Sequence, residues 1–284
     1  MLVIPYNYYS NLSSYEEFVI KTNLLGYDVS DEVVLNSLYK VEKYYCIVVN
    51  GHFCFLDDKG NKAENVVIKG DFECFGLELT SLEGCPKEIG GDFVCVQNKF
   101  TSLKGCPERV NGDFKCFRNQ LTSLEGCPKE VSGNFDCSFN KLTSLEGCPK
   151  EVGGSFNCSH NKLTSLEGCT KKICGNFNCD HNQLTSLEGC PEKVNGDFYC
   201  YYNELISLEE CPKEVGGSFY CHSNRITSLK GCIKKVGGNF DCSGNQLTSL
   251  RGCPKEIGGD FRCYCNKKRL TRPTKLKCKK FNDK

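Results

Sequence analysis

Residues 131–151 read V-S-G-N-F-D-C-S-F-N-K-L-T-S-L-E-G-C-P-K-E, and residues 152–172 read V-G-G-S-F-N-C-S-H-N-K-L-T-S-L-E-G-C-T-K-K. The same 21-residue unit continues without insertion from Ile68 to Cys263. Periods of this length are typical of solenoids, in which each repeat is one supersecondary unit. The length of 284 residues therefore indicates a stack of repeats and not two ordinary domains.

Phenylalanine and cysteine recur at fixed positions of the unit. The phenylalanine column consists of Phe72, Phe93, Phe114, Phe135, Phe156, Phe177, Phe198, Phe219, Phe240 and Phe261. The first cysteine column follows two residues later, at Cys74, Cys95, Cys116, Cys137, Cys158, Cys179, Cys200, Cys221, Cys242 and Cys263. The second cysteine column consists of Cys85, Cys106, Cys127, Cys148, Cys169, Cys190, Cys211, Cys232 and Cys253.

Each unit contains two successive patterns of apolar residues. Val131, Gly133, Phe135 and Cys137 alternate with polar residues, which predicts one strand with a buried face. After Asn140, apolar residues return every three positions, which predicts an arc that keeps one side chain inward at each corner. One unit cannot cover its own apolar side, so we expect stacked units to share one continuous core.

The segment Phe135-x-Cys137-x-x-Asn140-x-Leu142 resembles the consensus L-x-L-x-x-N-x-L of the leucine-rich-repeat family. The resemblance covers residues 68–265, and the short unit is most similar to the bacterial and bacteriophage branch. It implies an α/β-type repeat fold dominated by β structure: a right-handed, curved solenoid of about ten repeats with a parallel sheet on its inner face. Phenylalanine and cysteine replace the family's usual leucines.

An asparagine stands at the same place in nine of the units. An amide both donates and accepts hydrogen bonds, so this column is predicted to bond backbone groups left unpaired where the strand ends. Leu77 takes that place in the first unit. The column consists of Asn98, Asn119, Asn140, Asn161, Asn182, Asn203, Asn224, Asn245 and Asn266.

The 24 cysteines admit three interpretations. Free thiols that serve as small, inward-facing apolar side chains are favoured, which makes a cysteine ladder. Disulfides need side chains that point toward each other, whereas neighbours on parallel strands point the same way. Zinc sites need clustered ligands, yet no C-x2-C pair occurs and Cys263-x-Cys265 stands alone. We therefore expect no disulfide, no metal and no cofactor.

Residues 1–67 break the repeat and are predicted to form an N-terminal α+β cap. Short helices are expected near residues 14–24 and 30–38. Asn50-Gly51 lies between two apolar stretches, which indicates a β-hairpin. The segment 65–68 is expected to add a strand that leads into the repeats at residue 68.

Residues 266–284 contain nine Lys or Arg residues and one Asp. We favour a C-terminal cap, in which Leu270, Leu276, Cys278 and Phe281 cover the last repeat. The alternative is a basic arm that contacts phosphates or an acidic partner. The whole chain carries a net charge of only +1, so it has no overall attraction to nucleic acid or membrane.

The first residues lack the pattern of a secretory signal, and no apolar stretch is long enough to span a membrane. A cytoplasmic location, in the host cell if the protein is viral, is therefore expected. No phosphate loop, nucleophile motif or H-E-x-x-H motif is present, so the chain is predicted not to be an enzyme.

Function is sought in the exposed columns beside the strands. The column from Asp71 to Asp260 holds only Asp, Asn or Ser and is interpreted as a solvated surface. The other columns are variable and rich in aromatic residues, which favours a contact surface for another protein, with no small-molecule substrate and no membrane. The candidate partner-binding residues are Tyr199, Tyr201, Tyr202, Tyr220, His222, His181, His160, Phe139, Phe117, Arg118, Arg262 and Tyr264.

Three functional hypotheses follow. The leading one is a non-enzymatic protein-binding module, for instance a bacteriophage product that inhibits or modulates a host defence protein; this role rests on the resemblance. The second is a nucleic-acid-binding protein whose basic tail contacts phosphates and whose aromatic rings stack on bases. The third is a bacterial effector that acts inside a host cell.

Overall fold

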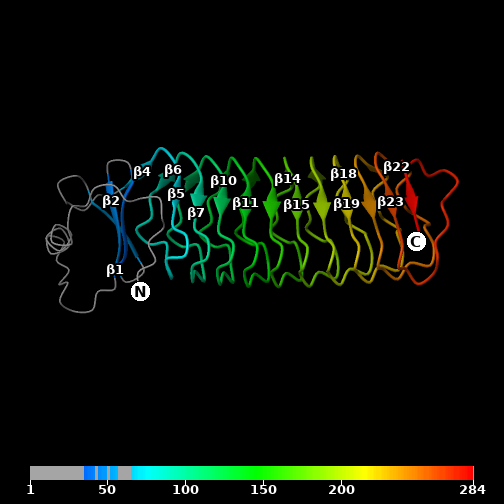
Figure 1. Cartoon of the computed structure of the whole chain (residues 1–284), viewed down its shortest axis with the longest axis horizontal. Helices are drawn as coiled ribbons and strands as arrows, with labels where there is room; N and C mark the ends of the chain where they lie inside the picture. Colours follow the sequence, from blue (N-terminus) through cyan, green and yellow to red (C-terminus); the bar gives the residue numbers. More distant parts are fainter. Residues whose placement is uncertain (1–34, 42–43, 50–51, 57–64, 284) are drawn as a thin grey trace.

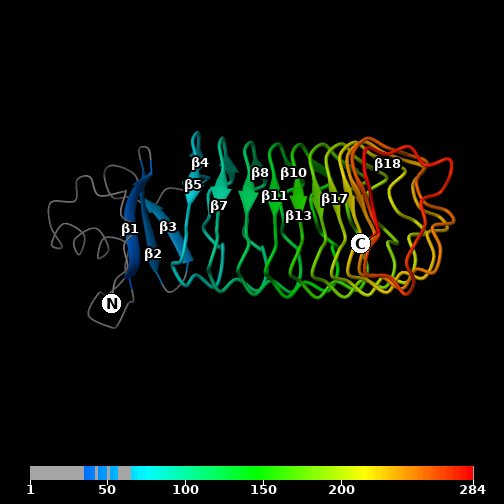
Figure 2. The same ribbon diagram turned by 45° about the vertical axis from the view of Figure 1, so that its right-hand side comes forward.

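The computed structural model describes residues 35–41, 44–49, 52–56 and 65–283, and the last of these segments forms a row of stacked coils (Figures 1 and 2). The coils pair with their neighbours in parallel and keep the 21-residue register, since Phe135 faces Phe114 on one side and Phe156 on the other. The predicted solenoid is therefore confirmed as a parallel β-solenoid. Within the described residues, no segment is helical.

Each coil contains two strands of two residues rather than the single strand that the alternation predicts. The first strands are β4 (Val67–Ile68), β6 (Glu88–Ile89), β8 (Arg109–Val110), β10 (Glu130–Val131), β12 (Glu151–Val152), β14 (Lys172–Ile173), β16 (Lys193–Val194), β18 (Glu214–Val215), β20 (Lys235–Val236) and β22 (Glu256–Ile257). The second strands are β5 (Phe72–Glu73), β7 (Phe93–Val94), β9 (Phe114–Lys115), β11 (Phe135–Asp136), β13 (Phe156–Asn157), β15 (Phe177–Asn178), β17 (Phe198–Tyr199), β19 (Phe219–Tyr220), β21 (Phe240–Asp241), β23 (Phe261–Arg262) and β24 (Phe281–Asn282).

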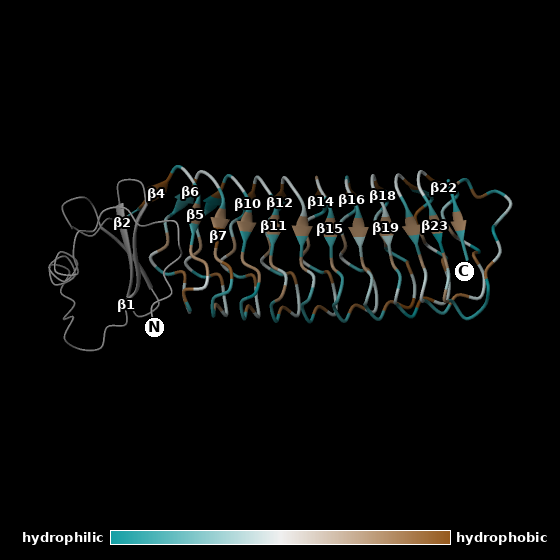
Figure 3. Cartoon of the chain, viewed as in Figure 1, coloured by the Kyte–Doolittle hydropathy of each residue, from teal (hydrophilic) through white to brown (hydrophobic). Residues whose placement is uncertain are grey.

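The two sets of strands make separate sheets. The second strands form one continuous 11-stranded sheet from β5 to β24. The first strands form an eight-stranded sheet from β4 to β18 and a two-stranded sheet of β20 with β22. The course of each coil changes between apolar and polar residues, which places one set of side chains inside and the other in solvent (Figure 3).

A column of small polar residues, which runs from Asp71 to Asp260, lies between the two strands of each coil. From Asp71 to Asn239, each side chain accepts a hydrogen bond from the backbone N–H of its equivalent in the next coil: Asn134 N donates to Asp113 Oδ1 at 2.8 Å, and Ser155 N donates to Asn134 Oδ1 at 2.7 Å. Most of the column is exposed or partly exposed, as the interpretation as a solvated surface expects, but the column also has a structural role. It is a hydrogen-bonded ladder that satisfies backbone donors between the sheets.

Glycine precedes this ladder for a steric reason. A Cβ on Gly133 would overlap the Asp113 carboxylate and the backbone of Gly112. The conformation itself does not need glycine here, because Gly133 is not among the glycines with positive φ. The recurrent Gly-Gly or Asn-Gly step thus makes room for the ladder of the preceding coil.

Phenylalanine rings fill the centre of the solenoid. Every ring of the column is at most 1% exposed, and successive centroids lie 5.0 to 5.9 Å apart. The first cysteine column is buried beside them as free thiols, and burial raises the pKa of thiols such as Cys137 well above its ordinary value. The cysteine ladder is therefore part of the core; the absence of disulfides stays a prediction.

The asparagine column bonds the backbone as predicted. Asn140 Nδ2 donates to the carbonyls of Cys116, Cys137 and Ser138 at 3.1 Å each, and its Oδ1 accepts from Leu121 N at 3.0 Å. One side chain thus joins two adjacent coils at the point where the longer sheet ends.

At the N-terminal end, β1 (Leu35–Val41), β2 (Tyr44–Val49) and β3 (His52–Leu56) form an antiparallel sheet of their own. Val49 pairs with His52, so the hairpin predicted around Asn50-Gly51 is present. The helix expected near 30–38 is wrong where it overlaps β1, because Leu35–Val41 pairs as a strand. The helix expected near 14–24 lies outside the described residues.

The C-terminal segment continues the solenoid. Strand β24 pairs in parallel with β23, and Phe281 stacks on Phe261 with centroids 5.4 Å apart. Leu270 and Leu276 are buried. This segment therefore adds an eleventh phenylalanine to the column and favours the cap over a free basic arm.

Candidate functional site

The predicted partner-binding residues lie on and just beyond the exposed face of the 11-stranded sheet. They occupy three columns: the residue after each core phenylalanine, and the two residues after each strand cysteine. Because neighbouring coils are in register, residues 21 apart become neighbours in space. The variable columns are thereby turned into stacks of side chains.

The longest stack runs through five consecutive coils. The Arg118 guanidinium lies 5.3 Å from the centroid of the Phe139 ring. Phe139 and His160 stack at 4.1 Å, His160 and His181 at 4.2 Å, and His181 meets Tyr202 at 4.6 Å with a 40° tilt. We call these five residues the long ladder.

Every member of the long ladder has a left-handed backbone. The φ angles fall from 55° at Arg118 through 53°, 51° and 49° to 48° at Tyr202. Glycine occupies the equivalent places at Gly76 and Gly244, where φ is also positive. This conformation costs a non-glycine residue roughly 1 kcal/mol. The large side chains therefore occupy positions where the backbone conformation favours glycine.

Two shorter stacks lie beside the end of the long ladder. Tyr201 and His222 stack at 4.5 Å with an 11° angle, and Tyr199 and Tyr220 stack at 5.1 Å with a 7° angle. Tyr201 also meets Tyr202 edge-on at 5.6 Å. The five residues that the sequence indicates as the densest part of the surface are thus brought together, and we call them the ring cluster.

Acidic side chains support the ring cluster from below. Tyr199 Oη donates to Asp197 Oδ2 at 2.7 Å. Burial, and then the hydrogen bond to that carboxylate, raises the pKa of the Tyr199 phenol. Burial and a hydrogen bond to Asp180 likewise raise the pKa of Tyr201. Both phenols therefore stay protonated and donate, which fixes their rings in place.

Histidines in the same region are held toward their neutral form. Burial, followed by the charge of His181, lowers the pKa of His160. Burial also lowers the pKa of His222, against the opposing effect of Asp241. Asp180 is only 3% exposed, and its Oδ1 lies 3.1 Å from His181 Nδ1.

Three predicted residues stand apart from the stacks. Among the residues that the structure describes, Phe117 and Tyr264 take part in no ring contact, because serine occupies the adjacent coil in their column at Ser138 and Ser243. Arg262 lies 3.9 Å from Asp241 as a loose ion pair. These residues share the face without joining a stack.

Sequence reasoning missed the acids beneath the rings. Asp180 and Asp241 stand in the same variable columns as the tyrosines, and both are under 5% exposed. The available signal was that Asp180 is the one acidic residue of its column. Its significance depends on the neighbouring coils, which only the stacked register brings near.

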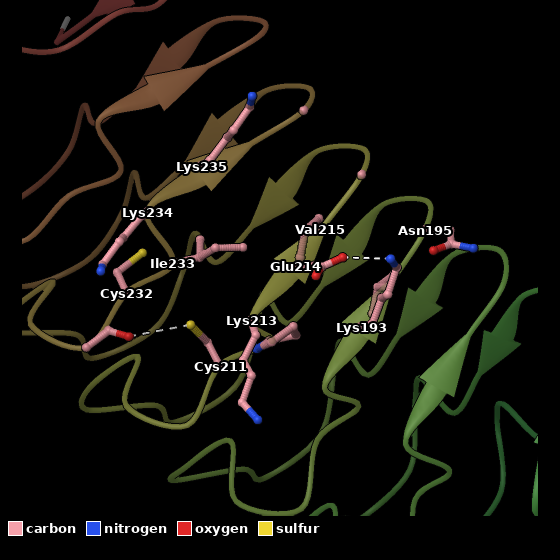
Figure 4. Close-up of a pocket in the computed structure, with 15 residues that line it drawn as sticks. Lys193, Asn195, Cys211, Lys213, Glu214, Val215, Cys232, Ile233, Lys234 and Lys235 are labelled. Atoms are coloured by element: carbon pink, nitrogen blue, oxygen red, sulfur yellow. Dashed lines mark hydrogen bonds and ion pairs between the residues drawn. The ribbon is translucent and has the colours of Figure 1, made fainter.

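A second surface lies along the shorter sheet, where that sheet is interrupted between β18 and β20 (Figure 4). The pocket is lined by Val215, Ile233 and the pair Cys211 and Cys232. A hydrogen bond between these thiols lowers the pKa of Cys211. Lys193 and Glu214 pair across its rim at 2.7 Å. No predicted site residue lines this pocket.

Over the described parts of the chain, no helix is long and apolar enough to cross a membrane.

Comparison with known proteins gives a limited result. No family model matches the chain, and no curated protein matches it. A solved structure of YopM from Yersinia enterocolitica WA-314 aligns with 17% sequence identity and a TM-score of 0.37. The alignment covers 75% of this chain and 64% of that one. The solenoid assignment accordingly rests on the strand register and the ladders described above.

Proposed function

We propose that this protein is a non-enzymatic protein-binding module whose contact surface is the ring cluster together with the long ladder. The observation that carries the proposal is the continuous stacking of side chains along the long ladder. The same left-handed position holds Gly76, Gln97, Ser223, Gly244 and Cys265 in other coils, so the fold does not require large side chains there. Phe139, His160, His181 and Tyr202 nevertheless pack against one another outside the core.

The chemistry of the surface fits a protein partner. Tyrosine and arginine contribute disproportionately to binding at protein interfaces, and the ring cluster presents phenol hydroxyls beside apolar ring edges. Phe139 and Tyr202 are 44% and 52% exposed, so apolar area is available to a partner. The rings are already packed against one another, which lowers the entropy lost on binding.

Nucleic acid is the weaker alternative. Base stacking needs free ring faces, yet the faces of His160 are occupied by Phe139 and His181. Asp180, Asp197 and Asp241 lie beneath the rings and would repel phosphates. The basic C-terminal segment is folded as the last coil, with Arg269 bonded to Asp283 at 2.9 Å.

The test is capture of partners from the native cell. We expect the triple variant Tyr199→Ser, Tyr201→Ser and Tyr220→Ser to lose a partner that the parent protein retains. The matched control carries Glu130→Ser, Glu151→Ser and Lys172→Ser on the other sheet, where the side chains are exposed. Equal capture by both variants would remove the ring cluster from the proposal.

The more specific roles share this surface and differ in the partner. A bacteriophage inhibitor would capture a host defence protein, whereas a bacterial effector would capture a protein of the cell it enters. Nucleic-acid binding is tested separately with Lys267→Gln and Lys268→Gln, which remove exposed charges and keep the last coil. Salt-dependent binding of DNA or RNA that these changes abolish would favour the alternative.

A further inference from the structure

Three potential metal ligands lie close together in two adjacent coils of the long ladder. The ligand atoms of His160, Asp180 and His181 all lie within 4.8 Å of one another. Two come from consecutive residues at the end of β15, and the third comes from the coil before. Three of the chain's four histidines, counting His222, lie in this region. The expectation of no metal rested on the cysteines and their spacing.

The Asp180 carboxylate lies in a buried place. It is 3% exposed, and within the described residues the ion pair with His181 is its only one. The neighbouring Tyr201 phenol supplies a hydrogen bond but no charge. A buried carboxylate without a cation is costly, so the site favours a positive ion beside it.

The donor set selects the kind of cation. Two imidazole nitrogens and one carboxylate oxygen suit zinc and similar transition metals, whereas calcium and magnesium prefer oxygen ligands. Both histidines are partly exposed, so their ring nitrogens can be reached by an ion from solvent.

Binding of one ion would draw the ligand atoms closer together and turn the His160 ring out of its stack with His181. Ligand atoms of a tetrahedral zinc site lie roughly 3.4 Å apart when each bond is about 2.1 Å. His181 Nδ1 and Asp180 Oδ1 are already 3.1 Å apart. His160 is a partly exposed surface side chain, and rotation of its ring brings a nitrogen toward the other two.

We propose that His160, Asp180 and His181 form a site for one zinc ion, with Tyr201 as a positioning residue that orients the carboxylate. The fourth position faces solvent and is open to water. The site goes beyond the proposed binding function, since it requires no partner protein.

The experiment measures zinc binding to the full chain by equilibrium dialysis, in a parent that carries Cys174→Ser and Cys265→Ser. These changes remove the two exposed thiols among the described cysteines. We expect one zinc ion per chain and no comparable binding of magnesium. With cobalt in place of zinc, the spectrum should lack the intense sulfur-to-metal charge-transfer band, because no thiolate is a ligand.

His160→Phe is the decisive variant, because phenylalanine already precedes it in the same stack at Phe139 and preserves ring packing. We expect zinc affinity to fall at least about 100-fold, since even outer-shell changes cost 10–100-fold. Asp180→Asn should give a similar loss, and Tyr201→Phe a smaller one. Glu151→Gln, at an exposed position of the shorter sheet, is the control and should bind zinc as the parent does.

Three results would overturn the site: no stoichiometric zinc in the parent, unchanged affinity in His160→Phe, or a cobalt spectrum of thiolate type. Because zinc binding and partner capture are measured separately, failure of one leaves the other standing.

Discussion

The solenoid contains two kinds of ladder at the same spacing, one inside and one outside. Inside, phenylalanine repeats from Phe72 to Phe261 and asparagine from Asn98 to Asn245 without interruption, and both columns are buried. Outside, the long ladder changes from arginine through phenylalanine and histidine to tyrosine. The inner ladders satisfy the same contacts in every coil, whereas the outer ladder places different chemistry at each level. Sequence uniformity therefore marks stability here, and variation marks the surface available for recognition.

The strongest test of the comparison is removal of one inner ring. Phe177→Ala deletes a ring at the centre of the column, between Phe156 and Phe198. We expect the free energy of unfolding to fall by about 3–5 kcal/mol, as is usual for cavities of this size. Denaturant unfolding followed by circular dichroism measures the loss. A change below about 1 kcal/mol would contradict the role of the column, because it would approach the roughly 0.5 kcal/mol that is usual for surface substitutions.

The second test removes one inner amide. Asn182 donates to the carbonyls of Cys158, Cys179 and Asp180 and accepts from Leu163 N. Asn182→Ala leaves these buried groups without that partner, so the free energy of unfolding should fall by about 2–3 kcal/mol. Gln183→Ala, at the adjacent exposed position, is the control and should cost far less.

The third test applies to the outer ladder, where we expect opposite behaviour. Phe139→Gly loses stacking worth about 0.5–1.5 kcal/mol but relieves roughly 1 kcal/mol of left-handed strain. The free energy of unfolding should therefore change by less than about 1 kcal/mol. A large loss would mean that the outer ring supports the fold, and the distinction between the ladders would fail.

The smallest expected effect is on pH dependence. Folding lowers the pKa of His160 and His222, so just below their ordinary pKa the unfolded chain binds more protons than the folded one. Stability should therefore decline modestly as pH falls from about 7.5 to about 5.5.

The double variant His160→Phe and His222→Phe keeps the rings and removes the titrating groups. Its unfolding curves should show a weaker decline over the same pH interval than those of the parent. An equal decline in both proteins would assign the pH dependence to other groups.

The sequence predicted the repeat, the core columns and the backbone role of asparagine, because each depends on neighbours related by a constant offset of 21 residues. The sequence predicted one strand per unit because alternation of apolar and polar residues shows only which side chains point inward. Strand pairing depends instead on which acceptors the backbone N–H groups bond. The ladder of small polar residues diverts those donors at Asn134, and the strand divides in two.

The candidate surface was predicted in part. The ring cluster follows from the register, so Tyr199, Tyr201 and Tyr220 could be placed together from sequence. Its acids could not, because the burial of Asp180 results from rings that project over it from its own coil and the next. The left-handed backbone of the long ladder was equally hidden, since arginine and tyrosine give no local signal for positive φ.

Within residues 65–283, neighbouring coils are joined through the column of small polar residues, the asparagine column and the phenylalanine column. Deletion or duplication of one 21-residue unit, such as residues 131–151, would leave every column in register. Such a change would remove or add one level of the outer ladder and shift the histidines relative to Arg118 by about 4.8 Å. Duplication in this gene would therefore act as a length adjustment of the recognition surface, and new combinations of side chains could arise without redesign of the interior.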